Sequence, residues 1–138
     1  MRRRSFAALA GIASVAGFFF VAQAVAASGD VQVAQAESDE AQFDALFSEG
    51  TAIYGEYCAG CHGAEGGGGA GPPFAGSDYP ASNRALVGSI LAGFVDHGMP
   101  AFADVLDDRE IAAVSTYIRN AWGNDFGITT ESYVAGQR

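Results

Sequence analysis

The spacing of apolar residues along the chain predicts three helices and no strand. Between residues 42 and 57, apolar side chains recur every three or four positions, which is the period of a helix with one buried face. Ser38 or Asp39 is the expected N-cap of this helix. A second, short helix is expected to begin at Ser82 or Asn83. Its apolar positions are Leu86, Val87, Ile90, Leu91 and Phe94.

The third helix has the clearest start signal in the chain. Asp107 precedes Glu110 by three residues, which is the spacing of a capping box, and Gly123 is expected to end the helix. Its apolar face comprises Ile111, Val114, Ile118 and Ala121. Between the first and second helices, residues 60–80 are rich in Gly and Pro, so we expect a long loop there.

The N-terminal residues have the pattern of an export signal. Three Arg at positions 2–4 precede an almost wholly apolar run from Ser5 to Val21. Small residues then offer cleavage sites after Ala24 or Ala26, as in a secretory signal peptide. An uncleaved membrane anchor is the alternative, because the apolar stretch approaches the ~20 residues that span a bilayer.

These patterns divide the chain into four parts. Residues 1–26 are interpreted as a signal peptide. Residues 27–40 are small, polar and acidic, so they are expected to form a flexible linker. Residues 41–124 contain the three predicted helices and are expected to form the folded domain. Residues 125–138 form a C-terminal extension for which the sequence predicts no definite structure.

The chain is strongly acidic, with 16 Asp and Glu against seven basic residues and a formal net charge of −9. All seven basic residues are Arg, and removal of the signal peptide would leave four of them. Nucleic-acid binding through phosphates is therefore excluded, because it needs a basic surface. Partners are expected to dock through a basic or an apolar surface.

Both cysteines lie in the run Cys58-Ala59-Gly60-Cys61-His62. This pattern is typical of covalent c-type haem attachment, because two thiols three residues apart can each bond one vinyl group of a porphyrin. His62 then offers an imidazole nitrogen to the iron. A thiol–disulfide oxidoreductase motif and half of a zinc site are less favoured, since no strands are predicted and no second Cys/His pair completes four zinc ligands. One covalent haem (haem c) would also supply the core that so small a domain lacks.

The sixth iron ligand is expected to be the thioether of Met99. Met99 lies between Gly98 and Pro100, off any helical stripe, which makes it an unusual position for a Met that merely fills a core. The alternatives are His97 and an open or water-bound iron.

The domain resembles the class I c-type cytochromes. Its matching pieces stand in the order of that family: Gly50 and Tyr54 before the cysteine run, Gly71-Pro72-Pro73-Phe74 after it, then Gly98-Met99-Pro100, then a last helix with Tyr117. The resemblance implies an all-α, small cytochrome c fold of three to four helices around one haem.

The resemblance also implies roles for individual residues. Gly50 is expected to let the first helix cross the last one closely, near Val114 and Tyr117. The carbonyl of Pro72 is expected to accept a hydrogen bond from the second ring nitrogen of His62, with the carbonyl of Pro73 as the alternative acceptor. Tyr79 and Arg84 are the candidates for binding the haem propionates.

An iron held by both His62 and Met99 has no position for a substrate. The expected function is therefore a periplasmic one-electron carrier, not an enzyme. The alternative is a haem c subunit of a periplasmic dehydrogenase or terminal oxidase complex, and a peroxidase-like enzyme is less favoured. The expected partners are redox proteins that donate or accept electrons. A membrane tether is expected only if the N-terminal segment is not cleaved.

Overall fold

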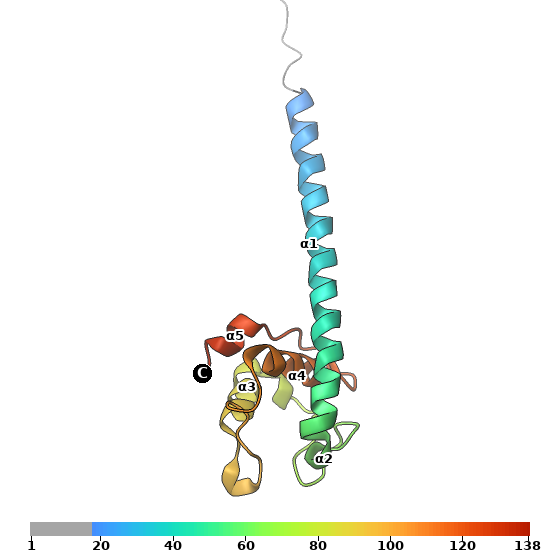
Figure 1. The fold of residues 1–138 in the computed structure, drawn as a ribbon. Helices are drawn as coiled ribbons and strands as arrows, with labels where there is room; N and C mark the ends of the chain where they lie inside the picture. The colour runs from blue at the N-terminus through green and yellow to red at the C-terminus, as the bar shows by residue number, and fades with distance from the viewer. Residues whose placement is uncertain (1–17) are drawn as a thin grey trace, which may run out of the picture. The chain divides into compact units, whose positions relative to one another are not determined.

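The computed structural model describes residues 18–138, and its regular elements are all helical (Figure 1). This confirms the predicted all-α class. In chain order the elements are α1 (Phe18–Ile53), the π-helical turn η1 (Tyr54–Cys58), α2 (Ala59–His62), the 3₁₀ turn η2 (Tyr79–Ala81), α3 (Asn83–Ala92), the 3₁₀ turn η3 (Val95–His97), α4 (Asp108–Asn120) and α5 (Glu131–Ala135).

The chain divides into two compact units, Met1–Ser38 and Asp39–Arg138. The described part of the first unit is the N-terminal stretch of α1, which begins at Phe18. The flexible linker predicted for residues 27–40 is therefore helical in this structure. Ala, Gln and Glu are frequent in this stretch and all favour helix. Every side chain from position 35 to 42 is exposed, so backbone hydrogen bonds rather than burial hold this part of the helix.

The predicted N-cap of the first helix is wrong for the same reason. Ser38 lies inside α1, where its hydroxyl donates a hydrogen bond to the carbonyl of Gln35 at 2.7 Å instead of capping a helix start. The export signal lies partly in residues 1–17, outside the described residues, and its cleavage stays a prediction. Within residues 18–138, no helix combines the length and the apolar character needed to cross a membrane.

The later helix starts agree with the sequence. Ser82 caps α3 by accepting a hydrogen bond from the amide of Ala85 at 3.3 Å. The capping box of α4 is confirmed, because the amide of Glu110 donates to the Asp107 carboxylate and the amide of Asp107 donates to the Glu110 carboxylate, both at 2.8 Å.

The second unit is built around α4, which contacts α3, α5, η1 and η2. Residues 111–116 of α4 are buried without a break. Apolar side chains of α4 and α3 form most of the core, and these include Leu86, Val87, Ile90, Ile111, Val114 and Ile118. The predicted apolar face of α4 is therefore buried, but so is the opposite, more polar face.

The crossing of α1 and α4 depends on Gly50. A Cβ atom at Gly50 would lie 2.1 Å from the carbonyl oxygen of Ala113 and 2.8 Å from the Cβ atom of Tyr117. The aromatic rings of Tyr54 and Tyr117 pack 5.3 Å apart, where α1 continues into η1. The expected close crossing near Tyr117 is confirmed, and glycine is what permits it.

The C-terminal extension folds onto the polar face of α4. Val134 of α5 and Thr129 are both fully buried. The amide of Thr129 donates to the hydroxyl of Thr116 on α4 at 3.0 Å, and the Thr129 hydroxyl donates to the side-chain oxygen of Asn83 at 2.7 Å. Residues 125–138 are thus part of the packed unit.

Arg119 joins this extension to the rest of the unit. Its side chain is buried and donates to four backbone carbonyls and to no carboxylate. Burial lowers the pKa of the guanidinium. Two of the acceptors are in or beside η2, with Pro80 at 2.7 Å and Ala81 at 3.1 Å. The other two, Phe126 and Gly127, belong to the extension.

Candidate haem-binding site

The cysteine motif is presented by two consecutive helical turns of different pitch. In the π-helical turn η1, the amide of Ala59 reaches back to the carbonyl of Tyr54. The α-helical turn α2 then contains Cys61 and His62. Single π-helical turns are rare and are often found at functional sites. Here the π-helical turn ends with the first cysteine, Cys58, and α2 carries the second, Cys61.

The glycine-rich loop folds back on the end of α2. The amide of Gly68 donates to the carbonyl of His62 at 2.8 Å, and the amide of Gly71 donates to the carbonyl of Cys61 at 2.9 Å. These carbonyls have no helical partner, because α2 ends at His62. The loop therefore caps the motif and fixes the residue that follows the second cysteine.

His62 is buried and its ring is held on three sides. Its Nδ1 lies 2.9 Å from the carbonyl oxygen of Pro72. Since a carbonyl only accepts, Nδ1 carries the proton and Nε2 keeps its lone pair. The ring stacks on Phe74, with centroids 4.4 Å apart, and a Cβ atom at Gly71 would lie 2.6 Å from the ring. The structure thus contains the expected hydrogen bond between His62 and Pro72. It leaves the other ring nitrogen free, as in histidines that bind a metal.

The two cysteines are free thiols, Cys58 half-buried and Cys61 exposed. Burial, with a smaller effect of the nearby Cys61, raises the pKa of the Cys58 thiol to about 11. A thiol that attacks disulfides needs a lowered pKa, so the environment of Cys58 does not suit that chemistry. A structural zinc site needs four converging ligands, and no three His, Cys, Asp or Glu side chains converge anywhere in residues 18–138.

The loop that carries Met99 forms a short closed turn between α3 and α4. Phe94 and Met99 exchange two backbone hydrogen bonds, of 3.0 and 3.2 Å. Met99 itself is half-buried and packs against the core, as Cys58 does. His97, the alternative ligand, is exposed on η3.

A direct aromatic contact joins the two candidate ligand segments. Tyr57, the residue before the first cysteine, meets the ring of Phe102 edge-on, with centroids 6.1 Å apart. Figure 1 shows α2 and the loop between α3 and α4 at the same end of the second unit. The structure therefore brings Cys58, Cys61 and His62 to the same region as Met99.

The structure gives the two propionate candidates different surroundings. The Tyr79 hydroxyl lies 2.5 Å from the hydroxyl of Ser89 and donates to the carbonyl of Ala85 at 3.2 Å, so it already has protein partners. Arg84 is exposed near the start of α3. Arg109 and Arg138 form ion pairs with Glu49 and Asp108.

Apart from the ligands, the surface here is unusually apolar for an acidic chain. Phe94 is 51% exposed, Val95 is 71% exposed and Tyr57 is 40% exposed. A flat apolar macrocycle fits this surface. The donor set suits haem iron as well, since His62 has a free ring nitrogen and Met99, in the loop between α3 and α4, offers a thioether. The residues present thus suit a covalent haem.

Sequence reasoning missed two contacts that shape this site. The buried hydroxyl of Tyr54 donates to the carbonyl of Gly63 at 2.7 Å, which ties the end of the motif back to η1. Burial is the largest of the effects that raise the pKa of Tyr54 to about 12. The contact between Tyr57 and Phe102 had no signal in the sequence, because the two residues are far apart along the chain.

The class of protein that these features indicate is the class I c-type cytochromes. They combine a Cys-x-x-Cys-His turn, a buried histidine with one free ring nitrogen and an all-helical fold. The cofactor of this class is covalently bound haem c, and its chemistry is electron transfer. Comparison with known families is more specific: the family described as "Cytochrome C oxidase, cbb3-type, subunit III" matches residues 45–118, more than half of the chain. The chain belongs to this family. The search of the curated proteins found no match to this sequence.

Proposed function

We propose that the protein is a periplasmic one-electron carrier in which His62 and Met99 are the axial ligands of a single haem. The observation that carries this proposal is the contact between Tyr57 and Phe102, whose ring centroids lie 6.1 Å apart. Tyr57 directly precedes the cysteine motif and Phe102 follows Met99 by three residues. The contact supports a site in which the two segments lie on either side of one group.

The residues around His62 prepare it to be a ligand. The bound haem supplies a one-electron ferric–ferrous couple. The Pro72 carbonyl holds the proton at Nδ1, which leaves Nε2 as the ligating atom and makes the imidazole more basic. As a ligand of that iron, the Met99 thioether would favour the ferrous state and would raise the reduction potential relative to a second histidine. An iron held by both side chains would have no position for a substrate, which favours a carrier over an enzyme.

Charge supports a partner with a basic docking surface. Within the described residues, Arg109 and Arg138 are paired with carboxylates and Arg119 is buried, which leaves Arg84 as the one exposed Arg without an ion pair. Arg84 is our candidate for a propionate ligand.

The proposed contact surface around the haem edge includes four exposed residues, Gly60, Ala64, Pro100 and Ala101. We expect electron transfer to a basic partner to slow as salt is added.

Stopped-flow mixing tests docking to a basic partner. The reduced cytochrome is mixed with its oxidised partner, and the rate constant of electron transfer is measured at increasing ionic strength. A rate constant that falls steeply with salt supports electrostatic steering by the acidic surface. A rate constant independent of salt contradicts it and favours docking through the apolar surface alone. Amino-terminal sequencing of the exported protein tests the periplasmic part of the proposal, since a start at residue 25 or 27 is expected and a start at Met1 rejects cleavage.

A second candidate function, a haem c subunit of a larger terminal oxidase or dehydrogenase complex, is favoured by one observation. The family that matches residues 45–118 is described as a subunit of a cytochrome c oxidase. The chemistry at the haem is the same in both cases and only the assembly differs. The native mass of protein purified under mild conditions separates them, because a free carrier elutes as a single chain and a subunit elutes with its complex.

A further inference from the structure

The segment that follows Met99 has little regular structure of its own. Between η3 and the start of α4 at Asp108 there is no named helix, only one turn in which the amides of Val105 and Leu106 donate to the carbonyl of Phe102 at 3.0 and 2.9 Å. Pro100, Ala101, Asp104 and Val105 are exposed. Two buried side chains, Phe102 and Leu106, attach the segment to the core. The amide of Phe102 also donates to the carbonyl of Ile90 in α3 at 3.0 Å.

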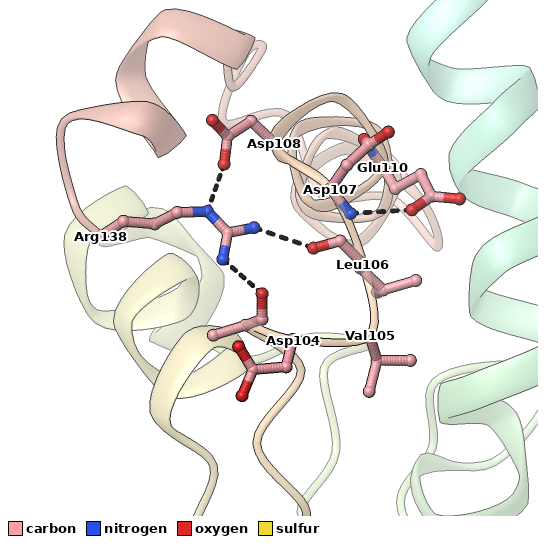
Figure 2. Close-up of a pocket in the computed structure, with 8 residues that line it drawn as sticks. Asp104, Val105, Leu106, Asp107, Asp108, Glu110 and Arg138 are labelled. Atoms are coloured by element: carbon pink, nitrogen blue, oxygen red, sulfur yellow. Dashed lines mark hydrogen bonds and ion pairs between the residues drawn. The ribbon is translucent and has the colours of Figure 1, made fainter.

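Arg138 supplies a further attachment from the C-terminal extension. Figure 2 shows its guanidinium pointing into the space between α4 and this segment. Its Nε donates to the carboxylate of Asp108, one terminal nitrogen donates to the carbonyl of Ala103, and the other donates to the carbonyl of Leu106 at 2.8 Å. One side chain therefore holds two carbonyls of the segment and the first residue of α4.

Arginine suits this task because its planar fork presents several donors in fixed directions. Lysine would make the ion pair with Asp108 but has no rigid fork to reach both carbonyls. The Arg138 side chain is 31% exposed and that of Asp108 is 29% exposed, so the ion pair is less screened than a fully exposed one.

The backbone that carries Arg138 is itself anchored. Val134, four residues earlier, is fully buried, and α5 packs on α4. The amide of Gln137 donates to the carbonyl of Val134 at 2.8 Å, which continues the turn of α5 towards Arg138. The extension therefore connects the segment after Met99 to α4, the helix with the most buried residues in the unit.

We propose that Arg138 is a positioning residue for Met99: by holding the carbonyls of Ala103 and Leu106, it keeps the Met99 segment in the conformation that ligates iron. This inference rests on the proposed function, since it takes Met99 as the sixth ligand. When Met99 leaves the iron by movement of its segment, rather than by rotation of its side chain alone, that movement works against the contacts with Arg138. The extension thus stabilises the six-coordinate haem against competing ligands, although residues 119–138 lie beyond the family match.

Imidazole, which competes with the thioether for ferric iron, is the probe for this role. Loss of the net stabilisation of one or two hydrogen bonds is expected to make imidazole bind about 3- to 10-fold more tightly to the full-length Arg138→Ala holoprotein. The matched control is Arg109→Ala, which removes the neighbouring ion pair with Glu49 and leaves the segment untouched. Its imidazole affinity is expected to equal that of the wild type. Arg138→Lys is expected to fall between the wild type and Arg138→Ala.

Amide hydrogen exchange supplies a readout that does not depend on the iron. Faster exchange at Phe102 and Leu106 in Arg138→Ala, and not in Arg109→Ala, supports the proposal. An unchanged imidazole affinity together with a normal far-red methionine band in the wild type overturns the proposal and leaves the proposed function intact. Absence of that band in the wild type overturns the ligand assignment, and the positioning role falls with it.

Discussion

The Nδ1 atom of His62 lies 2.9 Å from the carbonyl oxygen of Pro72, and this pair determines which ring nitrogen is free. The carbonyl belongs to the loop that caps α2, so the ring orientation depends on the path of that loop. Any change that moves the ring away from Pro72 also changes the basicity of Nε2.

Gly71→Ala tests this relationship. The new Cβ atom would lie 2.6 to 3.0 Å from three atoms of the His62 ring, so the ring must shift or the loop must open. We expect a loss of about 1–3 kcal/mol in the free energy of unfolding and a shift in reduction potential. Gly67→Ala is the control, because a Cβ atom there meets nothing within 4 Å. Equal denaturant midpoints and potentials for the two variants would contradict the packing described for His62.

Substitution of Gly50 tests the crossing of α1 and α4. Alanine favours helix over glycine by roughly 1 kcal/mol, so an unhindered site would gain stability. At Gly50 the Cβ atom would lie 2.1 Å from a backbone oxygen of α4, and we expect Gly50→Ala to destabilise by about 3 kcal/mol. Gly88→Ala on α3 meets nothing within 4 Å and is expected to stabilise slightly. Opposite signs of the two changes in urea unfolding confirm the crossing, whereas a stabilising Gly50→Ala refutes it.

The buried hydroxyl of Tyr54 is expected to make the protein less stable in alkali. Its pKa is raised from 10.0 to about 12 in the folded protein, chiefly by burial. Below pH 10 the hydroxyl is protonated in both states and its contribution is complete. Between pH 10 and 12 the unfolded chain loses the proton first, so the free energy of unfolding falls as pH rises. Tyr54→Phe removes the group and is expected to flatten this fall, with a remaining slope from Tyr117, whose pKa is also raised by burial.

Denaturant melts between pH 9 and 11.5 measure this effect. Tyr54→Phe also loses the hydrogen bond to Gly63, so its stability at pH 9 is expected to be lower than that of the wild type by about 1 kcal/mol. The informative quantity is the slope with pH. Parallel slopes for the two proteins would mean that the Tyr54 hydroxyl is not shielded from water.

Arg119 is expected to make the C-terminal extension essential for stability. Arg119→Met leaves the carbonyls of Pro80, Ala81, Phe126 and Gly127 without their donor. We expect a loss of about 2–3 kcal/mol in unfolding free energy, measured by thermal or urea melts. Arg109→Met is the matched control, because the Arg109 side chain is 51% exposed and its surface ion pair with Glu49 is expected to contribute less than about 1 kcal/mol. Similar melts for both variants would contradict the clamping role of Arg119.

The sequence predicted those parts of the fold that depend on residues close together along the chain. The capping box at Asp107 and the cap at Ser82 were both visible, because each lies within three residues of its partner. The part of α1 before position 42 was not predicted as helix, since its residues carry no apolar stripe. Helix propensity without burial leaves little pattern to detect.

The sequence predicted the residues that would bind the haem, but not the hydrogen bonds that hold the surrounding segments in place. The cysteine motif and the expected partner of His62 are readable because spacing and family order carry them. The buried Arg119 and the contacts of Arg138 are not, because a polar residue on an amphipathic helix or at the end of a chain is usually solvated. Only the folded extension turns these residues into hydrogen-bond donors for distant carbonyls.

The ferric absorption spectrum of Met99→Ala tests the central claim most directly. In the far red, the wild type and the control His97→Ala are expected to show the weak band of a thioether bound to ferric iron, and Met99→Ala is expected to lack it. All three proteins are expected to retain covalent haem in a pyridine haemochrome assay, because Cys58 and Cys61 are unchanged. A far-red band that persists in Met99→Ala, or that disappears in His97→Ala, would contradict the account.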